Sequence, residues 1–312
     1  MDVMAGAAVQ TGPKNIFNDG YIGMPVAITV EGSNPMTRNL LIFGQGLVTS
    51  HPHLKDHMEA ASDGNGKGVV KHVVKHALNA KWNIVKSFVM GFTDGRMTHV
   101  PVKNKKVKRY YQKLNRMASN FNVYTNISLL IYGGGLKTKE RVSARLGDIQ
   151  SHIAMAAFTL WKFEKDGSPK ADLPIVERAL QESLHEAEKA MADLNENYAG
   201  GPLMRGFMNL ITKPMSFMPF TGRYNNKMPK DKLDHKVTQA ITVPGDVRNR
   251  LTDGIYKPSE LTEQLGLLED TFNKYAEAKP IEKKIYKAVK AAIKTGDITK
   301  GDIAADKGLA YA

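Results

Sequence analysis

The stretch KERVSARLGDIQSHIAMAAFTLWKFEK, residues 139–165, decides the fold class of this chain. Its apolar side chains recur at the spacing of one face of an α-helix. This face carries Leu146, Ile149, Ile153, Leu160 and Trp161. The tetrapeptide DGSP at 166–169 breaks the helix, and residues 173–195 resume the same periodicity. Two long amphipathic helices joined by a short break predict an antiparallel helical bundle.

The helical pattern extends along most of the chain. Further helices are predicted over 36–61, 67–92, 110–132, 230–240, 244–251, 261–278 and 280–294. Glycine-rich breaks at 62–66 (SDGNG) and 133–135 (GGG) mark helix ends and loops. A short β-branched run, VAITV at 26–30, is the only stretch with the composition of a strand. We therefore predict an all-α fold, with domain boundaries that divide the chain into 1–62, 63–303 and a frayed tail at 304–312.

Composition narrows the class of protein. The 312 residues include no cysteine, which excludes disulfides and thiolate chemistry. The formal net charge of +13 can attract nucleic acid, anionic lipid or an anionic cofactor. No apolar run approaches the roughly 20 residues of a membrane span, and the first residues lack the layout of a signal peptide. We expect a cytoplasmic location, with peripheral contact at the inner membrane as an option.

A candidate catalytic carboxylate stands at the end of the β-branched run. Glu31 follows an apolar stretch and precedes Gly32. Burial there would raise the pKa of the Glu31 carboxyl, by up to about 3–5 units when complete, which suits proton abstraction near neutral pH. Gly32 has no side chain and so allows close approach of a ligand. The pattern alone favours an exposed turn or helix-capping role for Glu31 over a catalytic one.

The same region carries a family resemblance. The residues ITVEGSNPMTR at 28–38, followed by IFGQG at 42–46, resemble the catalytic-base segment of the acyl-CoA dehydrogenases. Four later stretches resemble the additional C-terminal region of the long bacterial fatty acyl-CoA dehydrogenases: RVSARLGDI at 141–149, ADLP at 171–174, KLDHK at 232–236 and PIEKK at 280–284. The resemblance implies that residues 1–62 belong to the catalytic helical domain. It implies that residues 63–303 form the bacterial-type C-terminal helical domain.

The resemblance also implies a chemistry. It implies FAD as cofactor, acyl-CoA as substrate, and an electron-transfer flavoprotein or similar acceptor as partner. Glu31 would be the base that removes the α-proton in fatty acid β-oxidation, and Gly32 would line the substrate site. Gly6, Ser33 and Asn34 would contact the flavin.

The family's preceding helical domain and β domain, which hold most of the flavin site, have no counterpart in these 312 residues. We therefore expect the isolated chain to bind flavin poorly and to turn over no acyl-CoA. A separate N-terminal half could complete the enzyme, and a homo-oligomer is a further option. The alternative is a non-catalytic helical remnant or assembly module.

Three other features suggest different functions. The Met- and Phe-rich stretch at 202–220 is either a core segment or an interfacial element for membrane contact. The basic run KNKKVKR at 103–109 is the only place with basic and aromatic residues together, so we do not expect nucleic-acid binding. The histidine pairs at 53 and 57 and at 72 and 76 have zinc-like spacing, but no third ligand accompanies them, so we expect no metal site.

Overall fold

The computed structural model describes residues 2–12, 15, 17–30, 37, 45–198, 201–216, 226–255 and 264–299. The chain divides into two compact units, one made of residues 1–22 and 235–312 and the other of residues 23–234. Every regular element among the described residues is a helix, and none of them is a strand. The predicted all-α class is therefore confirmed.

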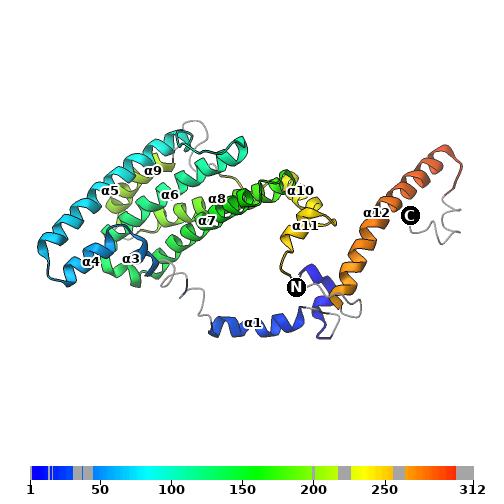
Figure 1. Cartoon of the computed structure of the whole chain (residues 1–312), viewed down its shortest axis with the longest axis horizontal. Coiled ribbons are helices and arrows are strands. Elements are labelled where there is room, and N and C mark those ends of the chain that lie inside the picture. Colours follow the sequence, from blue (N-terminus) through cyan, green and yellow to red (C-terminus); the bar gives the residue numbers. More distant parts are fainter. Residues whose placement is uncertain are drawn as a thin grey trace. The chain divides into compact units, whose positions relative to one another are not determined.

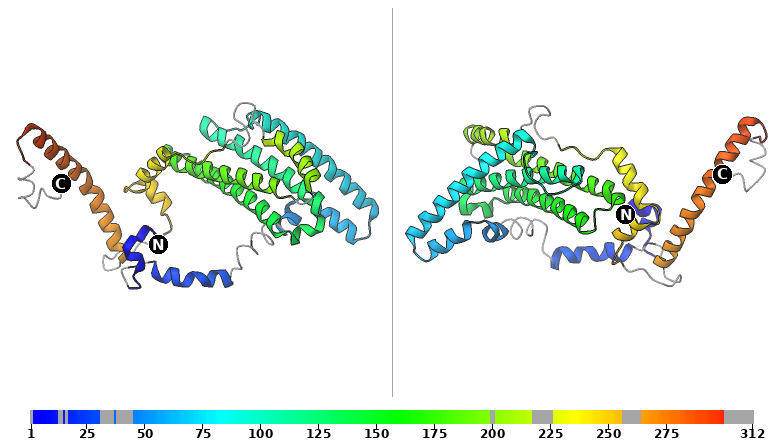
Figure 2. Two further views of the ribbon diagram at one scale, coloured as in Figure 1. Left: turned by 180° about the vertical axis from the view of Figure 1, so that it is seen from behind. Right: turned by 45° about the horizontal axis from the view of Figure 1, so that its top comes forward.

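The unit of residues 23–234 contains a bundle of long helices (Figure 1). Its helices are α4 (Leu54–Ser62), α5 (Gly66–Thr93), α6 (Lys105–Tyr132), α7 (Glu140–Lys165), α8 (Leu173–Glu196) and α9 (Gly201–Ser216). Helix α7 packs along α8 after a tight connection through the short helix η4 (Lys170–Asp172), so the two run antiparallel as predicted. Helix α6 contacts α5, α7 and α8, and α9 contacts α5 and α8. Figure 2 shows the same side-by-side arrangement from two further directions.

Two clusters of buried side chains hold this bundle together. The larger cluster joins α6, α7 and α8 through Met117, Tyr124, Leu146, Leu184 and Leu194, among others. The second lies toward the other end of α7 and α8 and includes Val107, Leu160, Phe163 and Leu180. Most of these residues lie on the faces that the helical spacing predicted, because one face of each helix is buried against its neighbours. Trp161, which was predicted on the packed face of α7, is instead 56% exposed.

Local capping explains where the two longest bundle helices begin. The Asn65 side chain accepts a hydrogen bond from the Gly68 N–H at 2.9 Å, and the Asn104 side chain accepts one from Lys106 N–H at 3.0 Å. Such side-chain oxygens satisfy backbone donors that have no partner in the first helical turn. Helix α6 ends at Gly133, which has a positive φ of 51°. The predicted glycine-rich breaks therefore lie at the observed helix ends.

The observed helix boundaries differ from the predicted ones at two places, both next to a proline. The helix predicted over 36–61 is interrupted within its described part, where α3 (Gly46–Ser50) and α4 are separated at His51–His53. Residue His51, which precedes Pro52, has an extended ψ of 127°, as the proline ring disfavours helical geometry there. The helices predicted over 261–278 and 280–294 are instead one helix, α12 (Gln264–Thr295), which continues through Pro280. Proline removes one backbone hydrogen bond, and the bonds on either side of it maintain this helix.

Other elements complete the description. The run VAITV at 26–30 forms the last part of helix α1 (Asn18–Val30), so its strand-like composition does not produce a strand. The short helices η1 (Asp2–Val9), η3 (Gly133–Thr138), α10 (Asp231–Ile241) and α11 (Asp246–Leu251) complete the set. The boundary predicted at 62–63 falls between α4 and α5, which pack against each other, and the domain assignment stays a prediction. None of the helices that the structure describes is long and apolar enough to cross a bilayer.

Candidate functional site

The residues predicted from the family resemblance lie almost entirely outside the described part of the chain. Glu31, Gly32, Ser33 and Asn34 are among the residues that the structure does not describe. Gly6 lies in η1, is exposed, and has open space where a side chain would begin. One exposed glycine does not form a flavin site. The catalytic and flavin-contact roles of these five residues therefore stay predictions.

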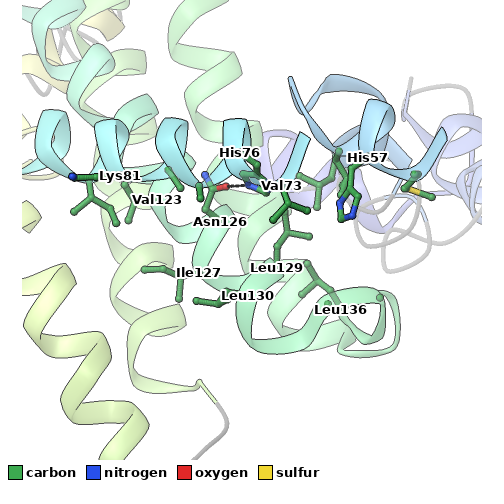
Figure 3. Close-up of a pocket in the computed structure, with 18 of the residues that line it drawn as sticks. His57, Val73, His76, Lys81, Val123, Asn126, Ile127, Leu129, Leu130 and Leu136 are labelled. Atoms are coloured by element: carbon green, nitrogen blue, oxygen red, sulfur yellow. Dashed lines mark hydrogen bonds between the residues drawn. The ribbon is translucent and has the colours of Figure 1, made fainter. Parts of the chain in front are cut away.

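An apolar groove lies in the unit of residues 23–234, with a volume of about 930 Å³. Its walls come from α4, α5, α6, η3 and α9, and Figure 3 shows α5 crossing above the residues of α6 and η3. The apolar lining includes Met58, Val73, Ala77, Ile84, Val85, Val123, Ile127, Leu130, Leu136 and Ile211. We call this feature the α5–α6 groove.

A hydrogen-bonded pair lies in the middle of the α5–α6 groove. The His76 ring donates through Nε2 to Asn126 Oδ1 at 2.6 Å (Figure 3). The amide nitrogen of Asn126 donates in turn to the Asn122 carbonyl oxygen and to Asn122 Oδ1, both at 2.8 Å. The amide of Asn126 is therefore fully engaged within the protein, and it offers little polar contact to a ligand in the middle of the groove.

Charge at the α5–α6 groove has one sign. Its charged or titratable lining residues are His57, His76, Lys81 and Lys137, and none of its lining residues is acidic. Within the described residues, the side chains of Lys81, Lys137 and His57 form no hydrogen bond and no ion pair. The groove thus combines apolar walls with two lysines that have no acidic partner among the described residues.

A histidine cluster adjoins this groove. The ring centroids of His51 and His76 are 4.5 Å apart, and His53 lies 6.3 Å and 6.1 Å from these two rings. Burial, followed by the charge of His76, lowers the pKa of His51. Among the described residues, no group of three histidine or acidic side chains has the arrangement of a metal site. Sequence reasoning from pairs four residues apart missed His51, which the break at Pro52 turns toward α5 and α6.

A second cluster of charged residues is buried where α5, α6 and α8 meet. Arg116 is only 1% exposed, and its Nη1 lies 2.8 Å from Asp94 Oδ1 and 3.9 Å from Glu188 Oε1. Arg109 also pairs with the Asp94 carboxylate and donates to its backbone oxygen at 2.6 Å. Glu188 Oε2 accepts the Asn226 N–H at 2.9 Å. We call this set the Arg116 cluster.

Burial shifts the ionisation of groups at the Arg116 cluster. It raises the pKa of the Glu188 carboxyl, and it lowers the pKa of Lys113 to about 8. The Lys113 ammonium donates to Asn226 Oδ1 at 2.6 Å. None of these residues lines the α5–α6 groove, and their contacts join α6, α8 and the turn after α5. Sequence analysis did not identify it, since its members come from distant parts of the chain.

The basic run at 103–109 is partly occupied by protein carboxylates. Lys106 pairs with Glu177 at 2.8 Å, and Arg109 belongs to the Arg116 cluster. These two cations therefore have carboxylate partners within the protein, and the expectation that nucleic acid is not a partner stays a prediction.

The structure is an all-helical module with an apolar groove that has lysines at its edge. The chain belongs to the family described as acyl-CoA dehydrogenase, C-terminal, bacterial type, whose model matches residues 48–309. The sequence resemblance is therefore confirmed for the C-terminal portion. No solved structure matches the chain.

Proposed function

We propose that this chain is the C-terminal part of an FAD-dependent fatty acyl-CoA dehydrogenase, which converts acyl-CoA to trans-2-enoyl-CoA in fatty acid β-oxidation. The observation that carries this proposal is the family match over residues 48–309. The match does not reach Glu31, so the base assignment rests on the resemblance of residues 28–38 to the catalytic-base segment.

In this proposal Glu31 takes the α-proton of the acyl thioester. Its backbone N–H helps to hold the thioester carbonyl, where negative charge develops as the proton leaves. Gly32 leaves room for the acyl group. FAD, when bound, would supply the acceptor for the hydride that leaves the β-carbon, and an electron-transfer flavoprotein or similar acceptor would be the partner that takes its electrons. Gly6, Ser33 and Asn34 would contribute flavin contacts beside those from flavin-binding domains.

Replacing Glu31 by glutamine tests the base assignment. The full chain is co-produced with the flavin-binding portion of the dehydrogenase, and dye reduction by palmitoyl-CoA is measured together with flavin content. We expect Glu31→Gln to lower kcat by about 10²–10⁴-fold, because the amide cannot accept the proton, while substrate binding changes little.

A matched control is Glu59→Gln, which changes an exposed carboxylate of α4 whose ion-pair partner among the described residues is Lys55, at 3.7 Å. This variant should keep full activity. Retention of activity by Glu31→Gln would contradict the base assignment. Absence of turnover in every combination would favour the alternative, a non-catalytic assembly module.

We also propose that peripheral membrane contact is made through the outer face of α5. Helix α5 has no acidic residue, and its charged residues are Lys67, Lys71, Lys75, Lys81 and Lys86. Its exposed large apolar side chains are Val70, Val73, Val74, Leu78, Trp82, Val85, Val89 and Phe92. A helix surface with exposed aliphatic and aromatic groups, and with lysine as its only charge, is suited to an anionic bilayer surface. A second copy would bring lysines against lysines, which disfavours self-association.

Tryptophan fluorescence tests this surface directly. The chain has two tryptophans, and Trp161→Phe leaves only Trp82, which is 67% exposed. We expect the Trp82 emission to shift to shorter wavelength with vesicles that contain phosphatidylglycerol, and not with pure phosphatidylcholine vesicles. Because burying one leucine contributes about 1.5–3 kcal/mol, Leu78→Asp should weaken co-sedimentation by at least about tenfold.

The comparison variant is Leu210→Asp, at an exposed position of α9 in the Met- and Phe-rich stretch. It should leave binding unchanged if α5 makes the contact. Loss of binding only in Leu210→Asp would assign the contact to α9 instead. A shift that depends on protein concentration without vesicles would indicate a second copy as the occupant.

A further inference from the structure

We propose that the α5–α6 groove binds an unbranched alkyl chain that carries an anionic head group, such as a long-chain fatty carboxylate. This binding site does not depend on the proposed dehydrogenation chemistry, since it uses none of the residues assigned to that reaction.

The first argument is size. A volume of about 930 Å³ lies near the upper end of the roughly 300–1,000 Å³ that is typical of small-molecule sites. The groove extends along α5, with Lys81 near one end and His57 near the other in Figure 3. Ile127, Leu130 and Leu136 lie on the facing side in the same view. This elongated shape suits a chain better than a compact ring.

The second argument is the lack of polar contacts along the groove. The single amide there, Asn126, already accepts from His76 and donates twice to Asn122. A nucleotide or sugar in this place would lose its hydrogen bonds to water without replacement, at a cost for each polar group. An alkyl chain has no such groups, and it gains free energy from each methylene removed from water.

The third argument is charge. The lining contains two lysines and two histidines and no carboxylate. Lys81 and Lys137 are exposed and form no ion pair among the described residues, so both can neutralise a ligand anion. Cationic groups at the edge of a low-dielectric wall attract anions and disfavour cationic amphiphiles. The chemistry of the ligand therefore combines an apolar tail with a negative head.

The experiment measures binding of palmitate to the full chain by calorimetry, below the concentration at which palmitate forms micelles. Octanoate, which has a shorter alkyl chain, tests the contribution of the tail. Hexadecanol, which has no negative charge, tests the contribution of the head group. We expect the dissociation constant to fall about fourfold per added methylene until the groove is filled. Hexadecanol should bind at least tenfold more weakly than palmitate. Equal binding of hexadecanol and palmitate would refute a charged head-group site.

Two sets of variants locate the site. Ala77→Trp fills the groove and should weaken palmitate binding at least tenfold, whereas Leu78→Trp, at the neighbouring position outside the lining, should not. The double variant Lys81→Glu with Lys137→Glu should have an effect of similar size. Its control, Lys75→Glu with Lys86→Glu, makes the same charge change outside the lining and should bind normally.

The source of the ligand is distinguished by competition among palmitate, palmitoyl-CoA and palmitoyl lysophosphatidic acid, since all three share an alkyl tail and an anionic head. The tightest competitor identifies the source. Glu31→Gln should bind palmitate as the wild type does, which separates this site from the catalytic proposal. Binding that none of the groove variants affects would place the ligand elsewhere and reject the inference.

Discussion

Replacement of Arg116 by methionine is expected to lower the free energy of unfolding by about 3 kcal/mol, the lower end of the range for breaking a buried ion pair. The reason is that Asp94 and Glu188 would stay buried without the guanidinium that lies between them. Asp94 keeps Arg109 as a partner, which limits the loss. Urea unfolding followed by circular dichroism measures the change.

An exposed arginine provides the matched control. Arg141→Met, near the beginning of α7, should change stability by less than about 0.5 kcal/mol. Adding Glu188→Gln to Arg116→Met should restore part of the loss, because the amide removes the uncompensated charge. A loss below about 1 kcal/mol in Arg116→Met would mean that the cluster is hydrated in solution.

Replacement of Gly95 by alanine should destabilise the bundle by about 2–5 kcal/mol, the sum of a conformational and a packing penalty. Gly95 has a positive φ of 71°, which costs a residue with a side chain about 1–2 kcal/mol. A Cβ atom there would lie 2.2 Å from the backbone oxygen of Gln112 in α6. To relieve this overlap, the turn after α5 must move away from α6. Thermal and urea unfolding both report the change.

Substitution of Gly64 measures the conformational penalty without the packing penalty. Its φ of 64° is similar, but nothing lies within 4 Å of a Cβ atom added there. Gly64→Ala should therefore show only the conformational penalty of about 1–2 kcal/mol. If both alanine variants lose the same stability, the close approach of Gly95 to α6 contributes nothing.

The long bundle helices could be predicted from sequence because their information is local. The predicted ranges 139–165 and 173–195 agree with α7 and α8 at one end each and differ by one residue at the other. Where prolines stand inside helical patterns, local rules were insufficient. Pro52 separates two helices whereas Pro280 lies within one, and the difference depends on the surrounding backbone.

The residues that come together in the candidate sites were harder to predict from sequence than the helices. Arg116 and Asp94 are 22 residues apart, and no periodicity links them. Valines of α5 recur at helical spacing as core residues do, yet Val70, Val73, Val74 and Val85 are exposed. A helical repeat in the sequence indicates that apolar side chains lie on one face of a helix. The repeat does not indicate whether another helix packs against that face.

The amino-acid sequence by itself determined the helical class, most helix positions and the family, because periodicity, capping and collinear motifs are properties of neighbouring residues. The tertiary structure alone decided which charges meet in the Arg116 cluster and that α5 and α6 enclose an apolar groove edged by lysines. Burial and electrostatic pairing depend on residues brought together from distant parts of the chain, and these contacts exist only after the helices have packed.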